Sequence, residues 1–241
     1  MKKLGFIVGG AILIFMIVAS VLIMNRPPVE KVTLVRYSAE DVVNMSYGIN
    51  FDLYDPETIL GPNNDNGGLD EKIKGDKNAP VIIFEYADYA CSHCAEMNTE
   101  INRIYNDYNG KVAIVFRNYL LGYSNGLEIA AAANAAYRQG YWENFKNTVF
   151  EEQAVWYDMK PKELKDYISQ TFAEASNGKG DIDRLFIEMS SNDVIQKIAF
   201  DHAAGDFVGL TGTPHFRING EQVKSSELRK KIDEILASKG L

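Results

Sequence analysis

The chain has 241 residues, of which 46% are hydrophobic and 24% are charged. This is an ordinary globular composition, long enough for one or two domains with a packed core, and it excludes disorder of the whole chain. The formal net charge of -8 argues against a nucleic-acid partner, because phosphate binding normally shows as clustered Lys and Arg.

The first 24 residues are a separate apolar segment. Two lysines precede 21 residues without a charge, 4–24, which at about 1.5 Å per helical residue suffice to cross a hydrocarbon layer of about 30 Å. A cleaved signal peptide is the alternative, but its apolar region is about 7 to 15 residues and ends in a small-residue cleavage site. We therefore predict a transmembrane anchor over 1–24, which makes a single-pass cell-membrane protein with an extracytoplasmic C-terminal domain.

Residues 25–68 are predicted to be a linker. They mix Pro, Asn, Asp and Gly with short apolar runs and end in the cluster Gly-Pro-Asn-Asn-Asp-Asn-Gly-Gly over 61–68. Such a cluster does not readily hold regular structure. The apolar residues of 32–60 follow neither the helical nor the strand period, so no element is assigned there.

The pattern becomes regular from residue 79. Residues 81–84, Val-Ile-Ile-Phe, are typical of a strand covered on both faces. Beyond a turn at 88–91, apolar residues recur at helical spacing until Asn109-Gly110 stops the helix. Residues 111–116 are rich in Val and Ile and predict a second strand, after a crossover long enough for parallel pairing with the first.

A helical domain is predicted over about 125–208, where strand signals are absent. The signals that divide it are Gly140 as a stop, a second helix over 141–152, Pro161 as the start of a third, and Asp181 and Asn192 as caps of two later helices.

The last residues predict a β-hairpin and a helix. The strand 214–218 leads through Asn219-Gly220 into 221–223, and Ser225 or Ser226 caps the final helix. The order of elements predicts an α/β fold with an inserted helical domain, because loops accept insertions at small entropic cost.

Cys91 and Cys94 are the only cysteines, and Ser92 and His93 separate them. At this spacing two thiols at a helix start reach one another, and the partial positive charge of the helix N-terminus stabilises a thiolate. Cys91 is the candidate nucleophile, and Cys94, one turn further on, is the candidate resolving thiol. A protonated His93 would lower the pKa of Cys91 further, and a stable thiolate makes the disulfide a stronger oxidant.

The alternative for this pair is half of a zinc site, since Cys-x-x-Cys is also a metal-ligand spacing. A structural zinc site needs four ligands, and the histidines available are His93, His202 and His215. We favour the redox interpretation and expect no metal and no cofactor. His202 is expected to be partly buried with its hydrogen bonds satisfied, and His215 either approaches the motif or packs in the sheet.

From residue 69 to the C-terminus the chain resembles the DsbA-like branch of the thioredoxin superfamily. The resemblance is carried in order by Ala79–Tyr86, Asp88-Tyr89-x-Cys91-Ser92-His93-Cys94, the helical domain, Gly212-Thr213-Pro214 and the Asn-Gly hairpin. It implies a thioredoxin fold with a cis peptide bond before Pro214, and Thr213 against the cysteines. It also implies that Glu85 is a buried acid that relays protons for Cys94. Many members have proline where this chain has Ser92, so the redox potential is not carried over.

The resemblance implies a thiol-disulfide oxidoreductase that introduces disulfides into exported proteins and is reoxidised by a quinone-linked membrane partner. A disulfide reductase or isomerase would use the same motif with the reverse electron flow. A non-catalytic module that holds unfolded chains or a metal ion beside Thr213 and Pro214 is the third hypothesis. In each case the working part is a domain over 69–241.

Overall fold

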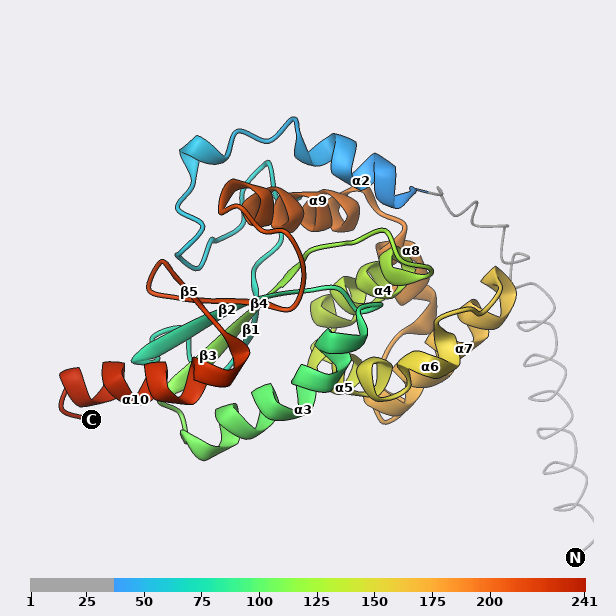
Figure 1. Cartoon of the computed structure of the whole chain (residues 1–241). Helices are drawn as coiled ribbons and strands as arrows, with labels where there is room; N and C mark the ends of the chain where they lie inside the picture. The colour runs from blue at the N-terminus through green and yellow to red at the C-terminus, as the bar shows by residue number, and fades with distance from the viewer. Residues whose placement is uncertain (1–36) are drawn as a thin grey trace, which may run out of the picture. The chain divides into compact units, whose positions relative to one another are not determined.

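The computed structural model describes residues 37–241, and a five-stranded sheet with the order β1-β3-β2-β4-β5 lies at its centre (Figure 1). The strands are β1 (Lys72–Lys74), β2 (Val81–Ala87), β3 (Val112–Asn118), β4 (His215–Ile218) and β5 (Glu221–Val223). β2 and β3 pair in parallel, as predicted, whereas the other neighbouring strands are antiparallel. The α/β class is therefore confirmed as a mixed sheet with helices.

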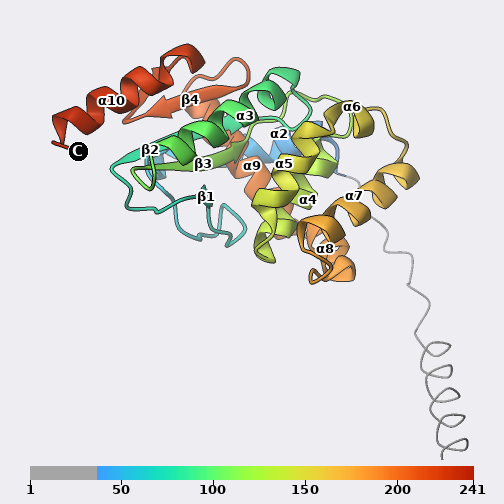
Figure 2. The same cartoon turned by 90° about the horizontal axis from the view of Figure 1, so that it is seen from below.

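Helices cover both faces of this sheet (Figures 1 and 2). α3 (Ser92–Asp107) and α10 (Leu228–Ser238) pack on one face through an aliphatic core. α9 (Asn192–Phe207) packs on the other face through a core rich in aromatic rings, among them Phe51, Phe84, Tyr86 and Phe200. The α3 face supports the helix that carries the cysteines.

The predicted helical domain lies between β3 and β4. Its helices before α9 are α4 (Gly126–Arg138), α5 (Trp142–Glu151), α6 (Gln153–Trp156), α7 (Pro161–Ala175) and α8 (Ile182–Met189). Three predicted boundaries are confirmed: Gly140 has a φ of 82° after α4, Pro161 begins α7, and Asp181 caps α8 by accepting from the Arg184 N–H at 2.9 Å. Cys91 and Cys94 share a core with the apolar side chains of this domain, so the motif packs against it.

Two predicted helix starts are wrong by one or two residues. The cap of α9 is Ser191, whose hydroxyl accepts from the Val194 N–H at 3.4 Å, and Asn192 is the first helical residue. Residues 225–227 form a short 3-10 helix, η2, so α10 begins at Leu228 and neither serine caps it. Both errors have one cause: several cap-type residues stand in a row, and the backbone rather than the residue type selects among them.

The described part of the predicted linker contains regular structure. α2 (Ala39–Ser46) and the 3-10 helix η1 (Phe51–Leu53) lie along α9 (Figure 1). Val42 and Phe51 are buried in these contacts. The predicted anchor, 1–24, lies outside the described residues. Over 37–241 no helix is both long enough and apolar enough to span a bilayer.

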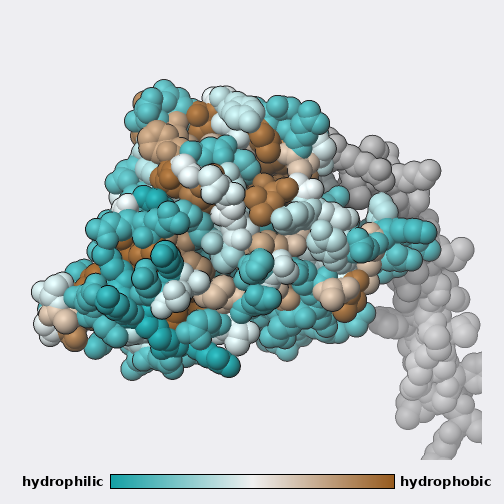
Figure 3. Space-filling view, viewed as in Figure 1, coloured by the Kyte–Doolittle hydropathy of each residue, from teal (hydrophilic) through white to brown (hydrophobic). Residues whose placement is uncertain are grey.

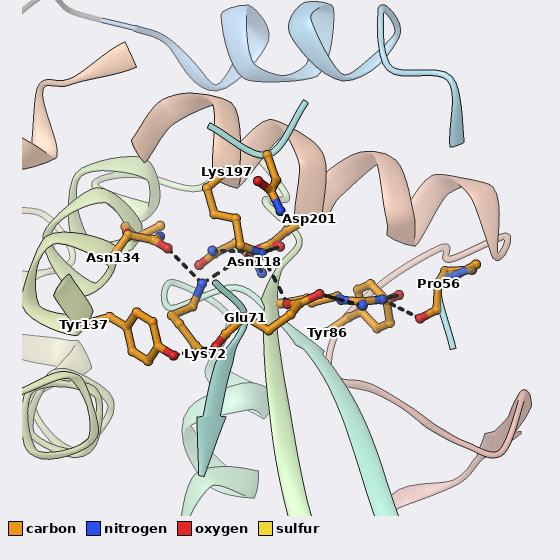
Figure 4. Close-up of polar contacts among 12 residues, drawn as sticks. Pro56, Glu71, Lys72, Tyr86, Asn118, Asn134, Tyr137, Lys197 and Asp201 are labelled. Carbon is orange, nitrogen blue, oxygen red and sulfur yellow. Dashed lines mark hydrogen bonds and ion pairs between the residues drawn. The ribbon is translucent and has the colours of Figure 1, made fainter. Parts of the chain in front are cut away.

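A buried charge cluster lies between β1, β3 and α9 (Figure 4). Its members, each at most 1% exposed, are Glu71, Lys72, Arg117, Lys197 and Asp201. Arg117 donates to Glu71 at 2.7 Å, and the Lys197 ammonium lies 3.3 Å from Glu71 and also bonds Asp201. Lys72 lies 3.4 Å from Asp201 and donates to Asn134 at 2.9 Å. The cluster ties the edge strand β1 to the body of the sheet and to α9.

The surface seen in Figure 3 is largely hydrophilic, with apolar residues in separate patches. A hollow of about 400 Å³ lies between α2, η1 and α9, and exposed Tyr47 and Phe207 are part of its lining. No residue of the cysteine motif lines this hollow. The hollow and the cysteine motif are therefore separate features of the molecule.

Candidate active site

The two cysteines lie where β2 passes into α3. Cys91 is the N-cap residue of α3, with an extended backbone (φ -84°, ψ 120°), and Cys94 lies in its first turn. Both are free thiols. The Cys91 N–H donates to the Asp88 carbonyl at 3.1 Å, which fixes the turn between strand and helix. Cys91 Sγ thus lies at the N-terminus of a helix of 16 residues, which is the positive end of the helix dipole.

The segment before β4 closes the site from another side. The Thr213–Pro214 peptide bond is cis, as the resemblance implies. Cys91 Sγ lies 3.4 Å from the Thr213 carbonyl oxygen, within reach of a hydrogen bond from the thiol. Cys91 is 5% exposed and Cys94 0% exposed, so a thiol arriving from solvent reaches Cys91 first.

The two thiols differ strongly in acidity. A hydrogen bond from the Cys94 thiol lowers the pKa of Cys91 to about 5, although burial opposes it, and the backbone N–H groups of Cys94 and His93 act in the same direction. The pKa of Cys94 is raised, because Cys91 holds its proton and because it is buried. At neutral pH the reduced pair is therefore a Cys91 thiolate beside a Cys94 thiol.

This difference predicts the pH profile of alkylation. In the reduced protein, the rate at which iodoacetamide modifies Cys91 should rise with pH around a midpoint near 5 and be nearly constant from pH 6.5 to 8, because only the thiolate reacts. Cys94 should stay unmodified over this range. Peptide mass spectrometry of quenched samples measures both rates. A midpoint near 9, the value of an ordinary thiol, would contradict the stabilised thiolate.

Glu85 lies on β2 and shares the α3 face of the sheet with Val81 and Ile83, because alternate side chains of a strand point the same way. It is 1% exposed, and its Oε2 has no hydrogen-bond partner among the described residues. Burial raises its pKa, and the charge of Lys146, a buried residue of α5, opposes that rise. A buried carboxyl of raised pKa therefore lies on the side of the sheet that faces α3.

The three histidines have different surroundings. The His93 side chain is exposed on α3, and it is the backbone N–H of His93 that helps to lower the pKa of Cys91. His215 lies on β4 beside Tyr86, and burial lowers its pKa. His202 is buried, with Nε2 3.2 Å from the Leu120 carbonyl oxygen. Its Nδ1 lies 3.3 Å from an Asp206 carboxylate oxygen but has no hydrogen-bond partner among the described residues, so the expectation of a fully satisfied histidine is met at one nitrogen alone.

Sequence reasoning missed two groups near the motif, Asp88 and Lys146. The Asp88 carboxyl is 1% exposed and accepts from the N–H groups of Ala90 at 2.8 Å and Leu121 at 2.7 Å. An Asp that accepts from the N–H two residues on is a known turn device, so a signal existed for Asp88. The sequence contains no signal that Lys146 is buried near the motif, because a lysine in an amphipathic helix is normally exposed.

The fold and the site together define a class of protein. A central strand leads into a dithiol at the start of a helix, and a loop with a cis-proline lies against the outer sulfur. This is the arrangement of thioredoxin-like dithiol proteins.

Known proteins resemble the chain in sequence and in structure. The Na(+)/H(+) antiporter NhaA 3 of Salinispora tropica is 27% identical over 155 residues, and the match covers 63% of this chain and 22% of the antiporter. The chain thus spans about a fifth of that relative's length. The probable disulfide bond formation protein D of Bacillus cereus is 25% identical, over 67% of this chain and 77% of that protein. The crystal structure of Wolbachia pipientis alpha-DsbA1 has a TM-score of 0.56 and 26% identity, over 74% of this chain and 94% of that one.

A family model described as thioredoxin matches residues 69–237. The chain belongs to this family, and it is a DsbA-like member of the thioredoxin superfamily.

Proposed function

We propose that the chain is a protein thiol-disulfide oxidoreductase that introduces disulfides into exported proteins through Cys91 and Cys94. The observation that carries this proposal is the stabilised Cys91 thiolate at the start of α3, beside a buried Cys94 that keeps its proton. A thiolate of low pKa is a good leaving group, so Cys91 is readily expelled when a second substrate thiolate attacks the mixed disulfide, and the reduced pair is stabilised. This favours oxidation of substrates over their reduction.

The proposed exchange has two steps. A substrate thiolate attacks Cys91 Sγ, the Cys91–Cys94 bond breaks, and Cys94 leaves with the electron pair and takes up a proton. A second substrate thiolate then attacks the substrate sulfur of the mixed disulfide, and Cys91 leaves as a thiolate. The substrate loses two electrons and two protons, and the protein ends as the Cys91 thiolate and the Cys94 thiol.

Neighbouring groups are assigned supporting tasks. Glu85, whose pKa is raised by burial, is assigned the task of supplying that proton to Cys94. Thr213 and Pro214 lie beside Cys91, where a bound substrate chain would run. His93 is assigned a weaker part as an exposed tuner of the Cys91 thiolate, acting when its ring is protonated.

The place of the reaction follows from the chemistry and from the N-terminal pattern. We assign the protein to the outer side of the cell membrane, held by the segment 1–24, because stable disulfides form outside the reducing cytoplasm. The name of the Bacillus cereus relative, a probable disulfide bond formation protein, supports the same assignment. A quinone-linked membrane protein is the proposed acceptor of the electrons, and the division into anchor, linker and 69–241 stays a prediction.

The decisive experiment is equilibration of the purified full chain with glutathione buffers, in which the thiol state of Cys91 and Cys94 is read by alkylation and mass spectrometry. We expect a reduction potential of about -120 mV, which marks a dithiol oxidase. A value of about -270 mV would instead support a reductase fed by a membrane electron carrier, and an intermediate value would support an isomerase. A pair that does not exchange would leave a non-catalytic binding module.

A further inference from the structure

The Asp88 carboxyl holds together two segments of the active site. Asp88 follows the last residue of β2, and its Oδ1 accepts from the Ala90 N–H at 2.8 Å, within the turn that ends at Cys91. Its Oδ2 accepts from the Leu121 N–H at 2.7 Å, in the segment after β3. One side chain therefore fixes the turn before the nucleophile and joins it to the start of the helical domain.

The space around this carboxyl is closed. Asp88 is 1% exposed, and a Cβ on Gly126, the first residue of α4, would lie 3.0 Å from Oδ1. That distance is shorter than ordinary van der Waals contact, so the glycine lets the carboxyl seat against α4. The carboxyl is therefore enclosed between the turn before Cys91 and the start of α4.

The charge that does change is that of Cys91. It is a thiolate in the reduced protein and is uncharged in the disulfide, and its negative charge raises the pKa of Asp88. Burial is the larger cause of that rise, the two backbone hydrogen bonds oppose it, and the resulting pKa is about 6 in the reduced protein. Without the thiolate the pKa of Asp88 is lower.

We propose that Asp88 is a positioning residue that couples the redox state of the cysteine pair to uptake of a proton by its own carboxylate, an inference that rests on the proposed function. A substrate dithiol that reduces the disulfide supplies two electrons and two protons. One proton goes to Cys94, and the second goes partly to Asp88 instead of wholly to solvent. Because coupling is reciprocal, a protonated Asp88 favours the reduced pair by the same factor.

The other titratable groups around the motif differ from Asp88 in the charges that act on them. They are Glu85 on β2, His93 and Cys94 on α3 and His215 on β4. The charge that acts most on Glu85 is that of Lys146, and those that act most on His215 are Arg217 and Glu57, so neither is set chiefly by Cys91. From the side of β3 and α4, Leu121 and Gly126 contact Asp88, and neither ionises.

The test is the pH dependence of the glutathione equilibrium. Reduction by two glutathione molecules releases one proton wherever Cys91 forms a thiolate, so the logarithm of the reduction constant rises by one for each pH unit. In the wild-type full chain this slope should fall below one under about pH 6.5, where Asp88 begins to take up a proton. In Asp88→Asn the fall should begin only nearer the pKa of Cys91 itself, about 5, and above pH 7 the constant should favour the reduced form more than in the wild type, because no carboxylate then opposes the Cys91 thiolate.

If Asp88 had a merely structural role, its replacement would change the reduction constant but would not change the number of protons released on reduction. Glu188→Gln, which removes a buried carboxyl of α8 that has no assigned part in the exchange, is the matched control and should leave the fall in slope at its wild-type pH. A wild-type slope of one down to pH 5, or the same profile in Asp88→Asn, would overturn the coupling while leaving the proposed function intact. Failure of the wild-type pair to exchange would instead refute the function.

If Asp88→Asn does not fold, the wild-type protein together with Glu85→Gln decides the question. Infrared difference spectra between its oxidised and reduced forms near pH 6 should show a protonated carboxyl group appearing on reduction. The Glu85→Gln protein should retain this signal. A reduced-minus-oxidised spectrum without any carboxyl signal would contradict the proposal.

Discussion

Replacing Asp201 with alanine is expected to lower the free energy of unfolding by about 3–5 kcal/mol, the cost of removing one partner from a buried ion pair. Asp201 is the acid between Lys197 and Lys72, and it accepts from the backbone and side-chain N–H groups of Asn118 at 3.1 and 2.9 Å. Its loss leaves these donors buried without that acceptor, which adds the desolvation penalty of each. Urea denaturation at pH 7, followed by the fluorescence of Trp142 and Trp156, measures the change.

Two matched variants make this prediction specific. Asp193→Ala removes another acid of α9, but one that is 54% exposed and 3.8 Å from Arg138, so it should cost no more than about 1 kcal/mol. Lys72→Met removes a cation from a cluster with three cations and two anions and should cost no more than about 1.5 kcal/mol, since it leaves the charges balanced. Equal losses for Asp201→Ala and Asp193→Ala would show that the cluster does not support the fold.

The pH dependence of this stabilisation follows from the direction in which folding shifts the pKa of Asp201. Burial raises the pKa of Asp201, but Lys197 and Lys72 outweigh it, and the net pKa lies below the ordinary 3.8. A group whose pKa is lowered on folding stabilises the protein above its unfolded-state pKa and loses that contribution as the pH falls through the folded-state value. The difference between wild type and Asp201→Ala should therefore be constant from pH 5 to 7 and shrink below about pH 4.

The buried charge cluster also shows where sequence reasoning reached its limit. The sequence of β1 is Lys-Ile-Lys. Three residues of which two are charged do not show the alternation of apolar and polar residues that predicts a half-buried strand. Lys72 is nevertheless 0% exposed, because Asn134 and Asp201 accept from it across 62 and 129 residues of chain. Partners so far apart are joined only by the fold, so the edge strand was missed.

The candidate site was easier to predict from the sequence, because most of its residues lie close together along the chain. Cys91 and Cys94 stand one helical turn apart, and the strand and helix that hold them have clear apolar periods. Pro214 is far away along the chain, and its place against Cys91 came from the resemblance rather than from any pattern. The environment of Asp88 could not be predicted, since its hydrogen bond to the Leu121 N–H depends on how two turns meet.

Cys91→Ser should lower the rate of thiol-disulfide exchange at pH 7 by at least about 1000-fold. The reason is the difference in acidity between the thiols: Cys91, with a pKa of about 5, is almost wholly ionised at that pH, whereas Cys94 keeps its proton and is 0% exposed. The remaining Cys94 thus supplies almost no thiolate. Exchange with a small aromatic disulfide measures the loss, and a variant with more than a tenth of the wild-type rate would place the nucleophile elsewhere.

Replacements of Cys94 separate its two tasks. Cys94→Ala and Cys94→Ser both remove the resolving thiol, so each should accumulate mixed disulfides with substrate proteins on Cys91. They should differ in the acidity of Cys91, because the Cys94 hydrogen bond is the largest cause of its lowered pKa. Serine can still donate that hydrogen bond, so the alkylation midpoint should stay low in Cys94→Ser and rise toward the ordinary 9.0 in Cys94→Ala. Identical midpoints would mean that the N–H groups of α3 alone hold the thiolate, and the site would owe its oxidising strength to the helix rather than to its second thiol.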